Sequence, residues 1–117
     1  MAHGLEVTQF ETGDCYVIAL RGELDLGTVS SLDETVKRFP EESGKDLLLD
    51  LSGLDFMDST GLNLVLRFWS RCQQSGNGFR LVPGAGVQRP LEISGLMKEL
   101  RDSGGLVAAS GRPEAEE

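Results

Sequence analysis

The sequence predicts an α/β domain: a mixed β-sheet of about four to five strands with helices packed on it, opening with a β-hairpin. Short apolar runs with strand character alternate along the chain with segments whose apolar residues recur every three to four positions. The first two apolar runs, residues 5–9 and 15–20, are separated only by a turn sequence, whereas the later runs are separated by helical patterns. This order favours an antiparallel pair followed by parallel strands that are joined by helices.

The expected hairpin follows from the side-chain pattern of its two strands. Residues 5–9 alternate between apolar and polar, as a strand with one buried face does, and residues 12–14 have the composition of a turn. Residues 15–20 are apolar on both faces, which is typical of an interior strand. We therefore expect the second strand to lie inside the sheet and the first at its edge.

A helix and a central strand are predicted next. Apolar residues recur at helical spacing at Val29, Leu32, Val36 and Phe39. Asp25 or Thr28 is the expected N-cap, and Pro40 ends the helix because it cannot donate the next N–H. Residues 47–51 then form a nearly continuous apolar run, as in a strand covered on both faces, and residues 52–55 lead out of it.

The most strongly patterned helix follows Asp58, Ser59 and Thr60, three residues of N-cap type, and ends near residues 73–74. Its apolar positions are Leu62, Leu64, Val65, Leu66, Phe68, Trp69 and Cys72, which together span an arc of roughly 200°. An arc this wide exceeds what packing on a sheet alone requires. We expect this helix to flank a second surface as well, either a neighbouring helix or a partner.

The remaining elements complete one domain. Residues 79–82 form a strand, and a third helix carries Leu91 and Ile93, with Pro90 in its first turn and Gly95 as its stop. Leu96, Met97 and Leu100 pack after it, and residues 106–108 form a last edge strand. The domain is expected over residues 1–109, with residues 110–117 as a disordered acidic tail.

Composition excludes several classes of function. The chain has 117 residues, 39% hydrophobic and 26% charged, which is typical of a globular domain. A net charge of −8 argues against nucleic acid and anionic membranes as partners, since both require a basic surface. The sequence shows neither a membrane span nor a signal peptide, so we expect a cytoplasmic protein with Cys15 and Cys72 as buried free thiols.

The residues for common active sites are missing. His3 is the only histidine and lies near the N-terminus, so no serine–histidine pair, cysteine–histidine pair or zinc site can be assembled, and no cofactor is expected. One enzyme alternative is a dimeric aspartic protease, whose motif is Asp-Thr-Gly or Asp-Ser-Gly. Here Asp58 is followed by Ser59, Thr60 and Gly61, which is one residue too long, and by a helix instead of a strand.

The start of the patterned helix allows two interpretations. The first N–H groups of a helix lack intrahelical acceptors and carry partial positive charge, so they stabilise a phosphate. A serine at this position could therefore gain a phosphoryl group without unfolding its helix. The simpler interpretation is that Asp58 or Ser59 caps the helix, as most such residues do.

Four segments give the chain its resemblance to a known family. The segment Phe56-Met57-Asp58-Ser59-Thr60-Gly61-Leu62 resembles the signature of bacterial anti-sigma factor antagonists of the STAS (sulfate transporter and anti-sigma antagonist) family. Residues 22–25, 48–54 and 91–96 resemble three further elements of that family in the same order, so the resemblance covers roughly residues 5 to 108. It implies a STAS fold and a regulatory protein that is not an enzyme.

The resemblance also implies a switch. Ser59 matches the serine that is phosphorylated by the partner anti-sigma factor, itself a serine kinase, while Asp58 matches the preceding acidic residue and Thr60 the second hydroxyl. In the family, the unphosphorylated protein captures the anti-sigma factor and frees the sigma factor; phosphorylation abolishes capture, and a serine phosphatase restores it. Asn63 departs from the glycine that is common at its position. The partner-binding residues implied here are Asp25, Asp58, Ser59, Thr60, Gly61 and Asn63.

Other roles within the family remain open at this point. A STAS domain can serve as a scaffold or accessory subunit of a stress-signalling assembly or of a lipid-transport ATPase complex. We expect a monomer or a weak dimer. The sequence does not identify the sigma factor or the regulated process.

Overall fold

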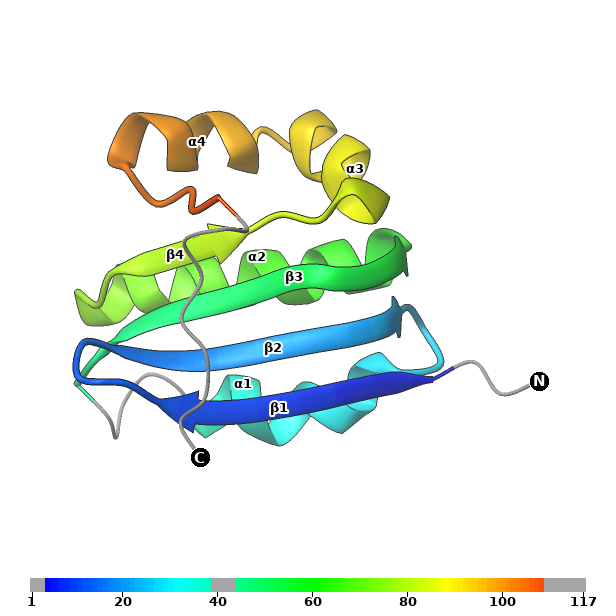
Figure 1. Ribbon diagram of the computed structural model, residues 1–117, viewed down its shortest axis with the longest axis horizontal. Helices are drawn as coiled ribbons and strands as arrows, with labels where there is room; N and C mark the ends of the chain where they lie inside the picture. Colours follow the sequence, from blue (N-terminus) through cyan, green and yellow to red (C-terminus); the bar gives the residue numbers. More distant parts are fainter. Residues whose placement is uncertain (1–3, 39–43, 109–117) are drawn as a thin grey trace.

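The computed structural model describes residues 4–38 and 44–108. A four-stranded sheet runs in the order β1 (Leu5–Glu11), β2 (Cys15–Leu24), β3 (Asp46–Met57), β4 (Phe79–Val82), as Figure 1 shows. β1 and β2 are antiparallel, whereas β3 is parallel to both β2 and β4. The predicted mixed sheet with an opening hairpin is confirmed.

The central strand has the two-sided burial that its sequence predicts. Leu47, Leu49 and Leu51 belong to the main hydrophobic core, whereas Leu48 points to a smaller cluster on the other face. Successive side chains of a strand point to opposite faces, so an unbroken apolar run needs cover on both.

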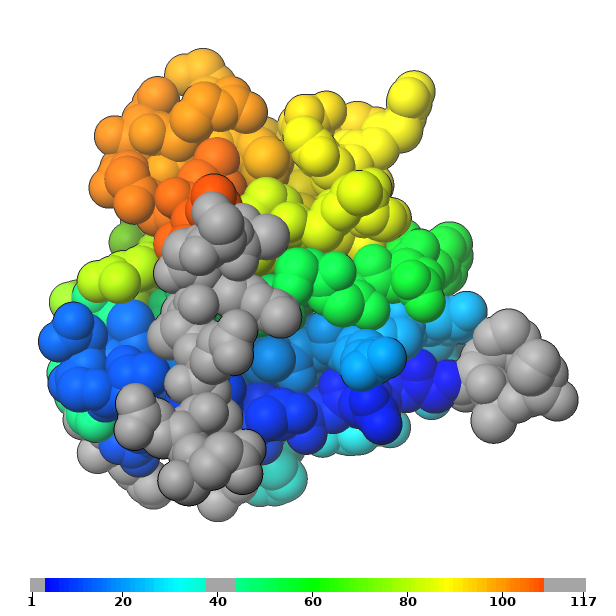
Figure 2. Space-filling view, in the orientation of Figure 1, coloured from blue at the N-terminus to red at the C-terminus, as the bar shows by residue number. Residues whose placement is uncertain are grey.

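The described residues also form four α-helices. Helices α1 (Asp33–Arg38) and α2 (Ser59–Ser75) lie behind the sheet in Figure 1, and α3 (Gln88–Ile93) and α4 (Leu96–Ser103) form the part of the molecule above β4 (Figures 1 and 2). An Arg71 guanidinium N–H on α2 donates to the carbonyl oxygen of Lys37 on α1 (2.8 Å). The main core lies between the sheet and these helices.

The first predicted helix differs from expectation at its start. Residues Val29–Leu32 form a 3₁₀ turn, and the α-helix begins only at Asp33. Neither Asp25 nor Thr28 caps it with a side chain, because the Thr28 hydroxyl accepts from the N–H of Asp25 (3.0 Å) and donates to the carbonyl oxygen of Glu23 (2.9 Å). The expected end at Phe39 and Pro40 lies outside the described residues.

Both central strands are longer than predicted. Residues 52–55 were expected to lead out of the strand, but β3 continues through them to Met57, and β2 continues to Leu24. These extensions pair with each other from Arg21–Gly53 to Leu24–Met57, with irregularities that interrupt the register. The sequence pattern did not predict these strand extensions because polar residues interrupt their apolar runs. Polar residues are tolerated there because the sheet face opposite α1 and α2 is partly open to solvent.

The wide apolar arc of α2 is explained by two packing partners. Leu64, Val65, Phe68 and Cys72 are buried, whereas Leu62, Leu66 and Trp69 are half-buried at the edge of the main core. Leu66 and Trp69 line a groove whose opposite wall is formed by Ser94, Gly95 and Leu96, at the junction of α3 and α4. The second surface is therefore a neighbouring helical segment of the same chain.

The C-terminal part is confirmed except at its last element. Gly95 (φ 85°) ends α3, and Leu96, Met97 and Leu100 are buried as expected, although Ile93 is 76% exposed. The predicted edge strand at residues 106–108 is reduced to a single bridge between Leu81 and Leu106. The predicted boundary between residues 109 and 110 lies beyond the described part of the chain and remains a prediction.

The reactivity of the two cysteines tests how tightly the core is packed. Cys15 and Cys72 are free and buried, and burial raises the pKa of the Cys72 thiol to about 12. Because the thiolate is the reactive species, we expect both cysteines, and Cys72 most of all, to react slowly with a thiol reagent in the folded protein at mildly alkaline pH. In denaturant both should react completely. Rapid labelling of Cys72 without denaturant would show that the α2–sheet interface is open.

Candidate functional site

The predicted site lies where the parallel strands end. β3 runs directly into α2, and the loop after β2 lies beside this junction, at the right-hand end of the sheet in Figure 1. The N–H of Asp58 donates to the carbonyl oxygen of Leu24 (3.2 Å), which joins the last residue of β2 to the start of the helix. Two segments separated by more than 30 residues therefore meet here.

Asp58 is the N-cap of α2 and also anchors the neighbouring loop. One carboxylate oxygen accepts from the N–H of Gly61 (2.9 Å), which satisfies one of the unpaired amides of the first turn. The other oxygen accepts from the N–H of Leu26 (3.1 Å) in the β2–α1 loop. Of the two cap candidates, the structure selects Asp58, while its contact with Leu26 carries no signal in the sequence.

Gly61 allows the helix to approach β2 closely. A Cβ atom at this position would overlap the carbonyl oxygen of Leu24 and would lie 2.9 Å from the Leu24 Cγ. Real Cβ atoms essentially never come this close to another heavy atom. The glycine is therefore required by the packing of the first helical turn against the end of β2.

The two hydroxyls after Asp58 differ in exposure. Ser59, the first helical residue, is exposed, whereas Thr60 is half-buried. Within the described residues neither hydroxyl has a hydrogen-bond partner, while Asp58 accepts from the N–H groups of Gly61 and Leu62. The N–H groups of Ser59 and Thr60 are thus left at the positively polarised end of a 17-residue helix.

The other predicted site residues gather at the same end. Asp25 lies in the loop that Asp58 anchors, where its Oδ1 accepts from the N–H of Gly27 (3.0 Å). Asn63 is exposed one helical turn after Ser59, on the same solvent-facing side of α2. The structure therefore brings all six predicted residues to one end of the molecule.

Two exposed apolar residues at this site were not singled out from the sequence. Leu26 is 75% exposed and Phe56 is 48% exposed, and they belong to the loop and the strand end that flank Asp58. Clusters of large exposed apolar side chains are typical of interaction sites, and these two residues border the same helix N-terminus. A leucine after a strand and a phenylalanine within one are indistinguishable from core residues until the fold is known.

The carboxylate of Asp58 is engaged in structural hydrogen bonds. Both carboxylate oxygens of Asp58 are occupied by backbone N–H groups, so the geometry gives no support to the aspartic protease alternative. Across residues 4–38 and 44–108 no cluster of histidine, cysteine, aspartate and glutamate side chains could hold a metal ion. Over the same residues, no helix has the length and hydrophobicity needed to span a membrane.

The fold and the site define a class: a small α/β module that presents a serine at an anchored helix N-terminus on its surface. The chain belongs to the STAS domain family, whose sequence pattern it matches over residues 7–108.

Three proteins similar to this chain are named as anti-sigma factor antagonists. The anti-sigma-F factor antagonist RsfB of Mycobacterium tuberculosis is 28% identical over 97 residues, which cover 83% of this chain and 80% of RsfB. An anti-sigma-B factor antagonist of Staphylococcus epidermidis is 30% identical over 93 residues, 79% of this chain and 86% of the relative. The crystal structure of an anti-sigma factor antagonist from Mycobacterium paratuberculosis superposes with a TM-score of 0.71, at 25% identity and 81% coverage of each chain.

The double role of Asp58 predicts a stability effect. Asp58→Ala should lower the free energy of unfolding by about 1–3 kcal/mol, since it removes a helix cap and the acceptor for Leu26. Asp55→Ala is the matched control, because Asp55 is exposed and has no side-chain partner in the described chain; we expect a change within about 0.5 kcal/mol. Equal effects of both substitutions in denaturant titrations would contradict the anchoring role of Asp58.

The close packing of Gly61 predicts that its substitution by alanine changes stability in the direction opposite to helix propensity. Alanine in place of glycine usually stabilises a helix by about 1 kcal/mol. Gly61→Ala should instead destabilise by about 2 kcal/mol or more, because the added Cβ overlaps the Leu24 carbonyl. Gly13→Ala, in the hairpin turn, has no heavy atom within 4 Å of the new Cβ and should be neutral or slightly stabilising. A stabilised Gly61→Ala protein in thermal melts would refute the close approach.

Proposed function

We propose that the chain is an anti-sigma factor antagonist that is controlled by phosphorylation of Ser59. Unphosphorylated, it binds an anti-sigma factor that is also a serine kinase, and the sigma factor is released. Phosphorylation of Ser59 by that kinase ends the binding, and a serine phosphatase restores it. The names of the relatives support the general role, and the match of residues 56–62 to the family signature supports the switch.

One observation carries this proposal: Ser59 is exposed on a helix N-terminus that is fixed from both sides. Asp58 ties the first turn to Gly61 and to Leu26, so the position of the serine is set by β2, β3 and α2 together. The exposed Leu26 and Phe56 flank it with apolar surface. A kinase can reach the hydroxyl, and Leu26 and Phe56 offer apolar surface to a partner at the same end of the molecule.

The chemistry of the site explains how phosphorylation would act. A phosphate on Ser59 adds about −1.5 to −2 charges beside amides that stabilise an anion, so the domain keeps its fold. The bound partner, however, would have to accommodate a dianion where it had covered a neutral hydroxyl. A loss of about 100-fold in affinity corresponds to only ~2.7 kcal/mol, less than an unpaired buried charge costs.

Exposure also favours Ser59 over Thr60 as the phosphoacceptor. Thr60 is half-buried in the first turn, whereas the hydroxyl of Ser59 faces solvent. We assign Thr60, together with Asp25 and Asn63, to the partner-binding surface, whereas Gly61 is buried and positions the first turn of α2 beneath it. The relatives are named as antagonists of anti-sigma-F and anti-sigma-B factors, so binding assays against both kinds of anti-sigma factor identify the partner.

The test uses two substitutions at Ser59 and one control. Ser59→Ala should bind the anti-sigma factor whether or not ATP is present, and Ser59→Asp should fail to bind while remaining folded. Because Asp58 and not Ser59 caps the helix, Ser59→Ala should change stability by less than about 1 kcal/mol. Ser59→Asp should keep or gain about 0.3–1 kcal/mol from the helix dipole. Calorimetric titration and thermal melts measure both properties.

The control places the same charge at the other end of the same helix. Ser75 is the last residue of α2 and is exposed, so Ser75→Asp tests whether any added carboxylate on α2 weakens binding. We expect Ser75→Asp to bind like the parent protein. If Ser59→Asp binds as tightly as Ser75→Asp, then Ser59 is not the switch.

A further inference from the structure

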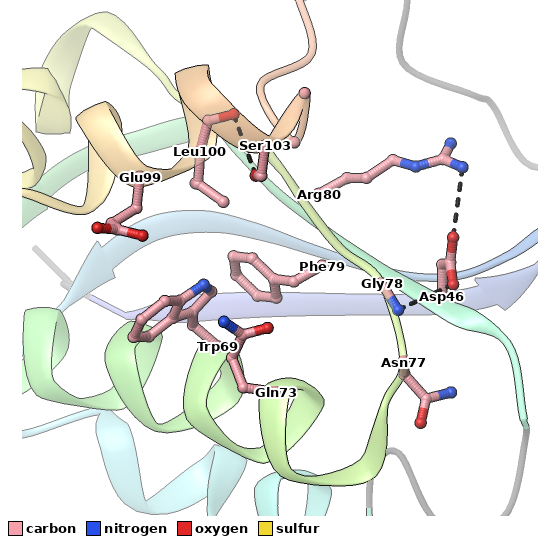
Figure 3. Close-up of a pocket in the computed structure, with 12 residues that line it drawn as sticks. Asp46, Trp69, Gln73, Asn77, Gly78, Phe79, Arg80, Glu99, Leu100 and Ser103 are labelled. Atoms are coloured by element: carbon pink, nitrogen blue, oxygen red, sulfur yellow. Dashed lines mark hydrogen bonds and ion pairs between the residues drawn. The ribbon is translucent and has the colours of Figure 1, made fainter.

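A cavity of about 280 Å³ lies at the opposite end of α2 from Ser59. Figure 3 shows Trp69 and Gln73 of α2 on one side of it and Glu99, Leu100 and Ser103 of α4 on the other, with Phe79 of β4 between them. Proposed partner-binding residues are all at the other end of the helix, so this cavity belongs to a separate surface.

The cavity combines an aromatic wall with an available carboxylate. Trp69 is half-buried, so part of its indole is open to the cavity, and Phe79 is 8% exposed beside it. Glu99 is exposed, and its carboxylate has no hydrogen bond or ion pair with any residue that the structure describes. A carboxylate beside an aromatic face is the arrangement that binds a cation.

The rest of the lining favours positive charge as well. Asp46 and Glu99 contribute two carboxylates and Arg80 one guanidinium, which leaves a net charge of −1. Arg80 is paired with Asp46 (3.4 Å) and lies at the other side of the cavity from Trp69 and Glu99 (Figure 3). The negative end of the long helix α2, whose C-cap is Gly76, lies at the same side of the molecule and adds to this negative potential.

The cavity is accessible along α2. A shallower groove of about 320 Å³ adjoins it, lined by Leu66 and by residues 94–96, and the two share Trp69, Gln73 and Glu99. A side chain that enters from the groove would therefore reach Trp69 and Glu99 together.

We propose that this cavity binds the guanidinium group of an arginine that a protein partner presents. The planar group stacks on Trp69 and donates its paired N–H groups to the carboxylate of Glu99, a geometry that a lysine ammonium cannot reproduce. A side chain presented by a protein fits this site because the groove along α2 that adjoins the cavity has room for the partner's backbone, and a chain of net charge −8 attracts a cationic segment. The proposal is independent of phosphorylation at Ser59.

Trp69 is the only tryptophan of the chain, so its fluorescence reports directly on this cavity. The probe is N-acetyl-arginine amide, titrated into the full chain at constant ionic strength, with N-acetyl-citrulline amide as its neutral counterpart. We expect a saturable change in Trp69 emission with the arginine compound only. Glu99→Gln should weaken the apparent affinity about fivefold or more. Glu92→Gln, which removes the same charge from α3, and Ser59→Asp should leave it unchanged.

Three results would overturn the proposal. An equal response to the citrulline compound would show that charge is not recognised, and an unchanged affinity in Glu99→Gln would remove the carboxylate from the site. Free arginine binding as tightly as the capped compound would indicate a site for the amino acid instead of a partner side chain. Since Ser59→Asp is included, failure of this proposal and failure of the phosphorylation switch are measured separately.

Discussion

The carboxylate of Asp58 is the interaction on which the candidate site depends. Its two oxygens hold the first turn of α2 and the β2–α1 loop at once, through Gly61 and Leu26. Without it, the serine that follows would sit on a helix end with no fixed relation to the loop beside it. The close contact of Gly61 with Leu24 also fixes the position of the helix, because it packs the first turn of α2 against the end of β2.

This arrangement separates the fold from the proposed switch. The core that secures α2 consists of residues further along the helix, among them Val65, Phe68 and Cys72, which are buried against the sheet. The hydroxyl of Ser59 has no hydrogen-bond partner within the described chain. A phosphate added there would change the charge of the surface without removing a contact of the core, so a binding partner can sense a modification that the domain itself tolerates.

Much of the architecture could be predicted from local patterns, and the exceptions have physical causes. The hairpin, the apolar central strand and the wide face of α2 are encoded in side-chain spacing, because burial on one or both faces selects residue types directly. The extensions of β2 and β3 were missed because polar residues and glycines interrupt their apolar runs. Residues 106–108 were overestimated because this apolar run makes only one bridge, to Leu81, and none of its three residues is fully buried. The burial of α2 by α3 and α4 could be anticipated only as an unnamed second surface.

The site was predictable in position but not in its details. The residue types Asp58, Ser59 and Thr60 mark a helix start in any sequence, and the family resemblance selects Ser59 among them. What no local pattern contains is the bond from Asp58 to Leu26, 32 residues earlier, or the exposure of Leu26 and Phe56 beside the serine. Such features arise from the packing of distant segments, and the same is true of the cavity between Trp69 and Glu99.

We infer that phosphorylation of Ser59 alters the surface of the domain and leaves its fold intact. Amide hydrogen exchange on the phosphorylated and unphosphorylated protein tests it most directly. We expect differences only in the first turn of α2, with the N–H of Leu26 still protected because its bond to Asp58 persists. Faster exchange at Leu26 together with changes in the β-sheet or α4 would show instead that the phosphate acts by rearranging the domain.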